Sequence, residues 1–96
     1  MSDIKHLQEE VVAWADSIFP HRTIHSAALK LYEEIGEMLR DPHSADEHAD
    51  IYIMMLDISS MYGVDVEEAV RQKLEINRQR AWKLTELGTL KHTPND

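Results

Sequence analysis

The chain has 96 residues, enough for one small domain and too few for a second hydrophobic core. It has no cysteine, which excludes disulfides and thiolate metal sites, and its net charge of −8 argues against binding to the phosphate backbone of nucleic acids. No apolar run approaches the roughly 20 residues that cross a bilayer, and the N-terminal sequence lacks the pattern of a secretory signal. We therefore expect a cytoplasmic globular protein.

Proline, glycine and short polar stretches divide the chain into four segments with helical spacing of apolar residues. The first helix is expected over about residues 3 to 18, before Pro20, and the second over about residues 26 to 40, before Pro42. We expect Trp14 to be mainly a core aromatic residue of the first helix. The apolar stripe of that helix comprises Ile4, Leu7, Val11, Trp14, Ala15 and Ile18.

The third helix is expected from Ser44 to about Tyr62, with Gly63 as its stop. Its residues 51–56, IYIMML, are apolar nearly all round, so this segment is either central or covered by another subunit. The fourth helix is expected from after Asp65 to about Leu87.

Four helices without useful strand patterns predict an all-α fold, an antiparallel four-helix bundle. We expect the domain to span residues 1–88 and a polar C-terminal tail to span residues 89–96. Because so small a domain has a marginal core, we expect oligomerisation, as a homodimer or homotetramer, to complete the bundle.

Acidic residues flank the short break between the second and third helices. Glu34 and Glu37 are three residues apart, so their side chains reach the same space on one helix. Glu47 and Asp50 repeat that spacing on the next helix, and an antiparallel helix pair would let all four carboxylates converge. Neighbouring inward carboxylates repel each other unless a cation balances them, and oxygen ligands alone suit Mg²⁺ or Mn²⁺.

Each acid also has a purely structural explanation. Ser44 and Glu47 match the S-x-x-E capping sequence, and Glu33, Glu34 and Glu37 together have the pattern of a solvated helix face. A di-iron centre is disfavoured because no histidine follows a glutamate by three positions. We expect surface positions without a functional role for His21, His25, His43 and His48.

Polar residues interrupt the apolar face of the fourth helix. Lys73, Asn77 and Arg80 fall within that face and need a partner. They either pair with the acids of the second and third helices in a structural charge network, or contact the phosphate groups of a metal-bound ligand. Both interpretations place the fourth helix opposite the acids.

Taken together, these motifs resemble those of the MazG-like all-α nucleoside triphosphate pyrophosphohydrolases. The resemblance extends over about residues 20 to 82 and rests on EExxE at residues 33–37, ExxD at residues 47–50 and KxxxNxxR at residues 73–80, followed by Trp82. It implies an enzyme that cleaves a nucleoside triphosphate between its α and β phosphates. FPHRT and INRQRAW are most similar to small phage-type members, some of which act on dGTP or dATP, and a phage-encoded chain would work in the host cytoplasm.

The resemblance also implies roles for the acids and for the polar residues of the fourth helix. Glu33 and Glu34 would be catalytic, with Glu33 a secondary ligand or a water-orienting group. The ligands of Mg²⁺, with Mn²⁺ as a substitute, would be Glu34, Glu37, Glu47 and Asp50, and the substrate-binding residues would include Lys73, Asn77 and Arg80. Trp14 lies outside the segment of the resemblance, and we expect it only secondarily to bind substrate, as a surface on which a nucleobase stacks.

Two other functions stay open on the sequence alone. A phosphoribosyl-ATP pyrophosphohydrolase of the same superfamily is disfavoured because the INRQRAW segment fits the MazG-like pattern better. From a different class, a non-catalytic helical interaction module would dimerise through its third helix and use its acids to bind a partner or a structural metal.

Overall fold

The computed structural model describes residues 3–80, 82–84 and 90–92. Its four helices confirm the predicted all-α class, and two short strands pair in an antiparallel hairpin after the last helix. The elements are α1 (Asp3–Ile18), α2 (Ile24–Arg40), α3 (Ala45–Met61), α4 (Val66–Gln79), β1 (Trp82–Leu84) and β2 (Leu90–His92).

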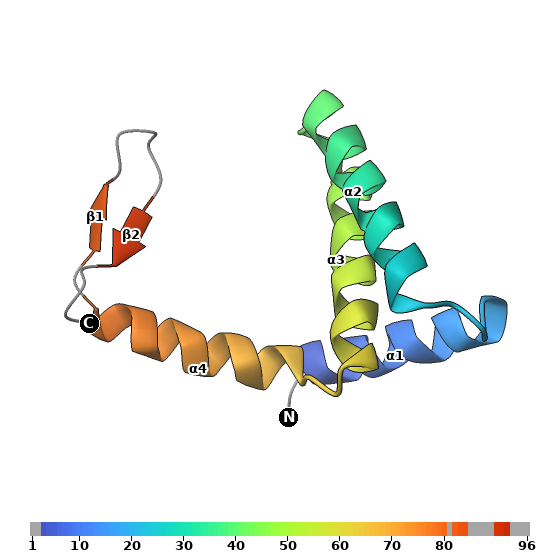
Figure 1. The fold of residues 1–96 in the computed structure, drawn as a ribbon, viewed down its shortest axis with the longest axis horizontal. Helices are drawn as coiled ribbons and strands as arrows, with labels where there is room; N and C mark the ends of the chain where they lie inside the picture. The colour runs from blue at the N-terminus through green and yellow to red at the C-terminus, as the bar shows by residue number, and fades with distance from the viewer. Residues whose placement is uncertain (1–2, 81, 85–89, 93–96) are drawn as a thin grey trace.

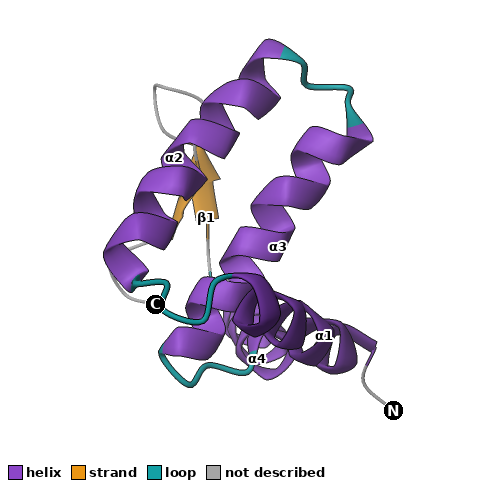
Figure 2. Cartoon of the chain, turned by 90° about the vertical axis from the view of Figure 1, so that its right-hand side faces the viewer, coloured by secondary structure: helices purple, strands orange, loops and turns teal. Residues whose placement is uncertain are grey.

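The helices form an open arrangement in the single chain. Figure 1 shows α2 and α3 side by side as an antiparallel pair, with α1 crossing the base of that pair. From the same base α4 projects away from the α2–α3 pair, on the side opposite to most of α1 (Figure 1). It also packs on α1. Figure 2 views the α2–α3 pair from the side, with α1 and α4 beneath it. One chain therefore supplies an antiparallel helix pair and a projecting fourth helix, and leaves the bundle open.

Short polar side chains cap the starts of α2, α3 and α4, and α2 begins at Ile24, slightly earlier than the predicted start at about residue 26. Thr23 begins α2 with a reciprocal cap, since its hydroxyl accepts from the Ser26 N–H at 3.1 Å and its own N–H donates to the Ser26 hydroxyl at 3.3 Å. Ser44 and Asp65 cap α3 and α4 through their side-chain oxygens, which accept from the backbone N–H groups of Glu47 and Glu68. Gly63, with a φ of 72°, follows α3 in the left-handed conformation that suits glycine.

The fourth helix is shorter than predicted. It ends at Gln79 instead of about Leu87, a position that lies outside the described residues. The prediction was wrong because Leu84 fits a helical period and a strand equally well, and the hairpin pairs it with Leu90. The division of the chain at residue 88 stays a prediction.

The core of the single chain is small. Among the described residues, the buried apolar ones are Val11, Ala15, Ala27 and Leu56, and no described residue of α4 is buried. Many large apolar side chains of the helices remain exposed, among them Trp14, Ile18, Tyr32, Leu39, Val70 and Leu74. The apolar faces of α1 and α4 are therefore only partly covered. Among the described residues, no helix is both long enough and apolar enough to cross a membrane.

The buried side chain of Gln8 joins α1 to the α3–α4 connection. Its amide nitrogen donates to the Leu56 carbonyl at 3.2 Å, the Ser60 hydroxyl at 2.9 Å and the Val64 carbonyl at 3.0 Å. Its amide oxygen accepts from the Val66 N–H at 3.1 Å, at the first residue of α4. Gln8 thus satisfies backbone groups at the end of α3 and the start of α4, and helps to set the direction in which α4 projects.

Candidate active site

Three carboxylates converge between α2 and α3. One oxygen each of Glu34, Glu37 and Glu47 lies within 4.8 Å of the other two. Glu34 and Glu37 come from successive turns of α2, and Glu47 comes from the first turn of α3, where Ser44 accepts a hydrogen bond from its backbone N–H at 3.4 Å. Capping and convergence are therefore compatible, because the cap uses the backbone of Glu47 and leaves its carboxylate to the cluster.

The donor set of this cluster fits a hard divalent cation. Glu34 is only 6% exposed, and one oxygen of Glu34 and one of Glu47 are buried without a hydrogen-bond partner. Desolvation raises the pKa of Glu47, and the neighbouring charges of Glu37 and Glu34 raise it further. Buried, unpartnered and mutually repelling carboxylate oxygens are the ligands that Mg²⁺ or Mn²⁺ would stabilise.

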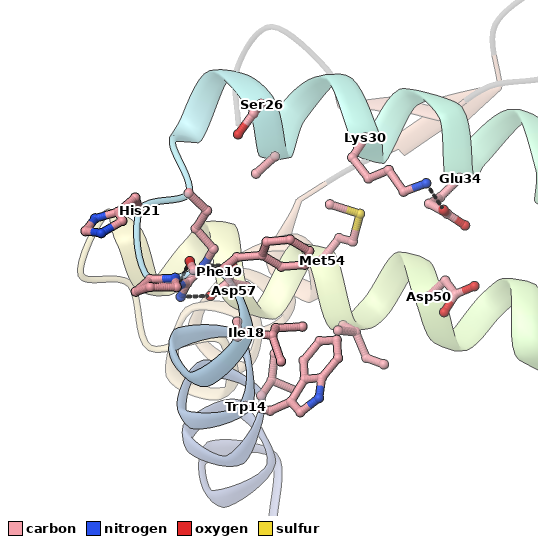
Figure 3. Close-up of a pocket in the computed structure, with 16 residues that line it drawn as sticks. Trp14, Ile18, Phe19, His21, Ser26, Lys30, Glu34, Asp50, Met54 and Asp57 are labelled. Atoms are coloured by element: carbon pink, nitrogen blue, oxygen red, sulfur yellow. Dashed lines mark hydrogen bonds and ion pairs between the residues drawn. The ribbon is translucent and has the colours of Figure 1, made fainter.

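Two of the predicted acids lie at the edge of the cluster. Asp50 is exposed and is not among the converging oxygens, although its charge also contributes to the raised pKa of Glu47. Figure 3 shows Asp50 on α3 across from Glu34 on α2, with both lining the same cavity. Glu33 is exposed and lies 3.5 Å from the ammonium group of Lys30. The structure thus brings three of the predicted ligands together and places Asp50 and Glu33 beside them.

A cavity of about 720 Å³ opens between α1, α2 and α3 beside the acids. Apolar side chains form most of its wall, including Trp14, Ile18 and Met54, and Glu34 and Asp50 lie at one end (Figure 3). Trp14 is 55% exposed, so the expectation of a core aromatic residue does not hold, and the indole lines the cavity instead. A cavity of this size with a few convergent polar groups is typical of small-molecule sites.

An ion pair that the sequence analysis missed fixes the opposite end of the cavity. The guanidinium of Arg22 donates two hydrogen bonds of 2.7 Å to Asp57 on α3, and another of 2.8 Å to Asp16 on α1. These bonds raise the pKa of Arg22 and hold the loop of Phe19 and His21 against the cavity. A signal was present, because Asp57 follows Asp50 by seven residues on the same helix face, but nothing in the sequence identified Arg22 as its partner.

The predicted substrate-binding residues of α4 do not reach the acids of their own chain. Lys73, Asn77 and Arg80 lie along or just after the helix that projects away from α2 (Figure 1). The expected juxtaposition of acids and cations is therefore absent within the described single chain. No histidine of the described residues contributes a ligand to the cluster, and His48 instead bonds the Pro42 carbonyl at 2.8 Å.

Known proteins are similar to this chain in sequence and in fold. The family model described as dATP/dGTP pyrophosphohydrolase matches residues 7–93. A dATP/dGTP diphosphohydrolase of cyanophage S-2L is 41% identical over 93 residues, which cover 95% of this chain and 89% of the relative. The chain belongs to the dATP/dGTP pyrophosphohydrolase family. This membership confirms the MazG-like resemblance and the predicted class of enzyme, a pyrophosphohydrolase.

A second relative and a solved structure extend the comparison. A dATP/dGTP diphosphohydrolase of Salmonella phage PMBT28 is 41% identical over 90 residues, which cover 93% of this chain but 31% of the relative, so this chain spans about a third of that protein. A cyanophage S-2L MazG-like pyrophosphohydrolase, solved with dGDP and three catalytic Mn²⁺ ions per active site, superposes with a TM-score of 0.88 at 39% identity. The match covers 99% of this chain and 97% of that one. Together with the carboxylate cluster, it confirms the predicted class of cofactor, a divalent cation.

Proposed function

We propose that this chain hydrolyses the purine deoxynucleoside triphosphates dATP and dGTP to the monophosphate and pyrophosphate, with Mg²⁺ as its cofactor and Mn²⁺ as a substitute. The observation that carries the proposal is the convergence of Glu34, Glu37 and Glu47 beside a largely apolar cavity. Family relatives named for dATP and dGTP support the choice of substrate.

The proposed ligands of the divalent cation are Glu34, Glu37 and Glu47, with Asp50 at the cavity side of the cluster. When bound, the cation supplies charge neutralisation at the phosphates and activation of a water molecule. Asp50 lines the cavity on α3, one turn after Glu47, and its carboxylate would be a further ligand of the cation. Glu33, exposed beside Glu34, is proposed to orient the attacking water.

The reaction is a direct hydrolysis without a covalent enzyme intermediate. The water oxygen forms a bond to the α-phosphorus, and the bond from the α-phosphorus to the bridging oxygen breaks. A proton of the water passes to a carboxylate, for which Glu33 and Glu34 are the candidates, and the electron pair of the broken bond leaves on pyrophosphate. The products are one deoxynucleoside monophosphate and one pyrophosphate.

The cavity is proposed to hold the nucleoside. Trp14 provides an exposed aromatic face along its wall, and Met54 of α3 provides a polarisable surface that lines the same cavity (Figure 3). The ion pair of Arg22 and Asp57 keeps the far end of the cavity fixed, so a base can enter a largely preformed site.

A second copy of this chain is proposed to complete the site. In one chain α4 projects away from the acids, yet its Lys73, Asn77 and Arg80 match the downstream substrate-binding segment of the family motif. Packing α4 of a second copy against the α2–α3 pair would cover exposed apolar residues such as Val70 and Leu74 and bring these cations to the phosphates. We therefore propose a homodimer, or a homotetramer built from such dimers.

The acidic charge and the small-molecule cavity favour a free nucleotide over a nucleic acid as the ligand. If the chain is encoded by a phage, as the named relatives are, it would act on nucleotides in the cytoplasm of the host cell.

Product analysis tests the proposed reaction. The purified protein is incubated with Mg²⁺ and each common nucleoside triphosphate in ¹⁸O-labelled water. The products are then separated, and their masses are measured by mass spectrometry. We expect dATP and dGTP to give pyrophosphate and a monophosphate that carries the label, because water attacks the α-phosphorus. Release of inorganic phosphate with a diphosphate, or no turnover of any nucleotide by folded protein, would contradict the proposal.

A further inference from the structure

Lys30 occupies the boundary between the carboxylate cluster and the cavity. It lies on α2 one turn before Glu34, and its ammonium group is 3.1 Å from the buried Glu34 carboxylate and 3.5 Å from Glu33. The ammonium group of Lys30 is a cation at neutral pH. Figure 3 shows its ammonium end directed along α2 to Glu34, while the side chain lines the cavity.

This contact conflicts with the proposed metal site. Lys30 bonds Oε1 of Glu34, one of the carboxylates expected to bind the divalent cation, and two cations that share one carboxylate repel each other. The Lys30 side chain is 55% exposed, whereas that of Glu34 is 8% exposed, so the lysine is the partner that can move. Its flexible four-carbon stem lets the ammonium group leave Glu34 without a shift of the helix.

An ammonium group of Lys30 that leaves Glu34 would move into the neighbouring cavity, which Lys30 lines. The neighbouring cavity wall is mostly apolar, so a cation there needs an anionic partner. A nucleotide with its base in the cavity and its phosphates at the acids would pass directly by this side chain. The other strong cation of the described cavity wall, Arg22, is already committed to Asp57 and Asp16.

We propose that Lys30 is an exchangeable cation, which neutralises Glu34 in the metal-free site and binds a substrate phosphate once a divalent cation takes its place. This role rests on the proposed function, because it requires a phosphorylated ligand that spans the cavity and the cluster. It assigns one residue of α2 to the phosphates in the same chain as the acids, in addition to the cations of α4.

The exchange predicts opposite effects on the metal and on the nucleotide. Lys30→Met removes the competing cation, so the dissociation constant for Mn²⁺ without nucleotide, measured from the free-ion electron paramagnetic resonance signal, is expected to fall roughly threefold or more. With Mn²⁺ saturating, the dissociation constant for a non-hydrolysable α,β-methylene dATP is expected to rise about tenfold, because a charged hydrogen bond is lost. Lys30→Arg keeps the charge and is expected to lie between Lys30→Met and the wild type in both constants.

Lys5→Met is the matched control, because it removes one positive charge from an exposed lysine of α1 that lies 3.8 Å from Asp65. We expect it to leave both constants unchanged. Equal constants for Lys30→Met and the wild type, or a change of both in the same direction, would overturn the exchange role and leave Lys30 as a simple helix-surface partner of Glu34. Product analysis of the wild type is independent of this result, so wild-type turnover combined with unchanged Lys30→Met constants would refute only the role of Lys30.

Discussion

Glu47 is under electrostatic strain in the metal-free protein. Desolvation and the charges of Glu37 and Glu34 raise its pKa in the folded state above the ordinary value of 4.5. The folded chain therefore binds the Glu47 proton more tightly than the unfolded chain does. This stabilising contribution is complete below about pH 4.5 and is lost as the pH rises through the raised pKa.

Replacing this carboxyl with an amide therefore has a pH-dependent effect on stability. In the presence of a chelator at pH 7.5, Glu47→Gln is expected to melt at a higher temperature than the wild type, because the repelled charge is gone. The difference is expected to shrink as the pH falls toward 4.5, and thermal denaturation at several pH values measures it. Asp46→Gln, an exposed neighbour in the same turn, serves as the control, and a lower melting temperature for Glu47→Gln at pH 7.5 would contradict this account.

The pair of Arg22 and Asp57 is a second site where one side chain matters to stability. Both side chains are largely buried, and removal of Arg22 leaves Asp57 without its bidentate partner. Arg22→Met is expected to lower the free energy of unfolding by about 3 kcal/mol, measured by urea denaturation. Arg78→Met removes an exposed pair with Glu75 and is expected to cost less than about 1 kcal/mol. Equal losses for the two variants would contradict the structural importance of the buried pair.

At the scale of the elements, the direction of α4 depends on the anchor at its first turn. Gln8→Leu keeps the size of the side chain but removes its bonds to the end of α3 and to the Val66 N–H. The loss leaves buried backbone groups unsatisfied, so we expect a decrease of about 2 to 4 kcal/mol in the free energy of unfolding. Gln72→Leu, which removes one exposed bond to Glu68, is the control. A neutral Gln8→Leu would show that α4 needs no such anchor.

Local patterns predicted the four helices and the acidic part of the candidate site, but neither the end of α4 nor the position of its cations. The spacing of Glu34 and Glu37 places both on one face of α2 whatever the tertiary structure, and caps such as Ser44 act within four residues. The position of α4 is not a local property, since an apolar stripe shows that a face is buried but not which chain covers it. The partner of Arg22 lies 35 residues away, and the hairpin pairs residues that also fit a helix.

At the scale of the whole molecule, a site completed by a second copy permits a complementation test. Glu34→Gln and Lys73→Met are each expected to lack activity, because one loses a metal ligand and the other a phosphate-binding cation. If acids and cations come from different chains, random mixing of the two variants in dimers is expected to restore about a quarter of the wild-type activity, from one intact site in each mixed dimer. The absence of any recovery in proven mixed dimers would place acids and cations on the same chain.

The account depends most on the claim that carboxylates of α2 and α3 share a divalent cation. Calorimetric titration of Mn²⁺ into the wild type and into the Glu34→Gln, Glu47→Gln double variant tests this claim most directly. The Glu9→Gln, Glu10→Gln double variant of α1 removes the same charge outside the cluster and is the control. We expect the control to bind Mn²⁺ with the affinity of the wild type. The dissociation constant of the Glu34→Gln, Glu47→Gln variant is expected to rise at least tenfold while the protein remains folded. Equal binding by all three proteins would contradict the account, because the three converging carboxylates would then not be the metal site.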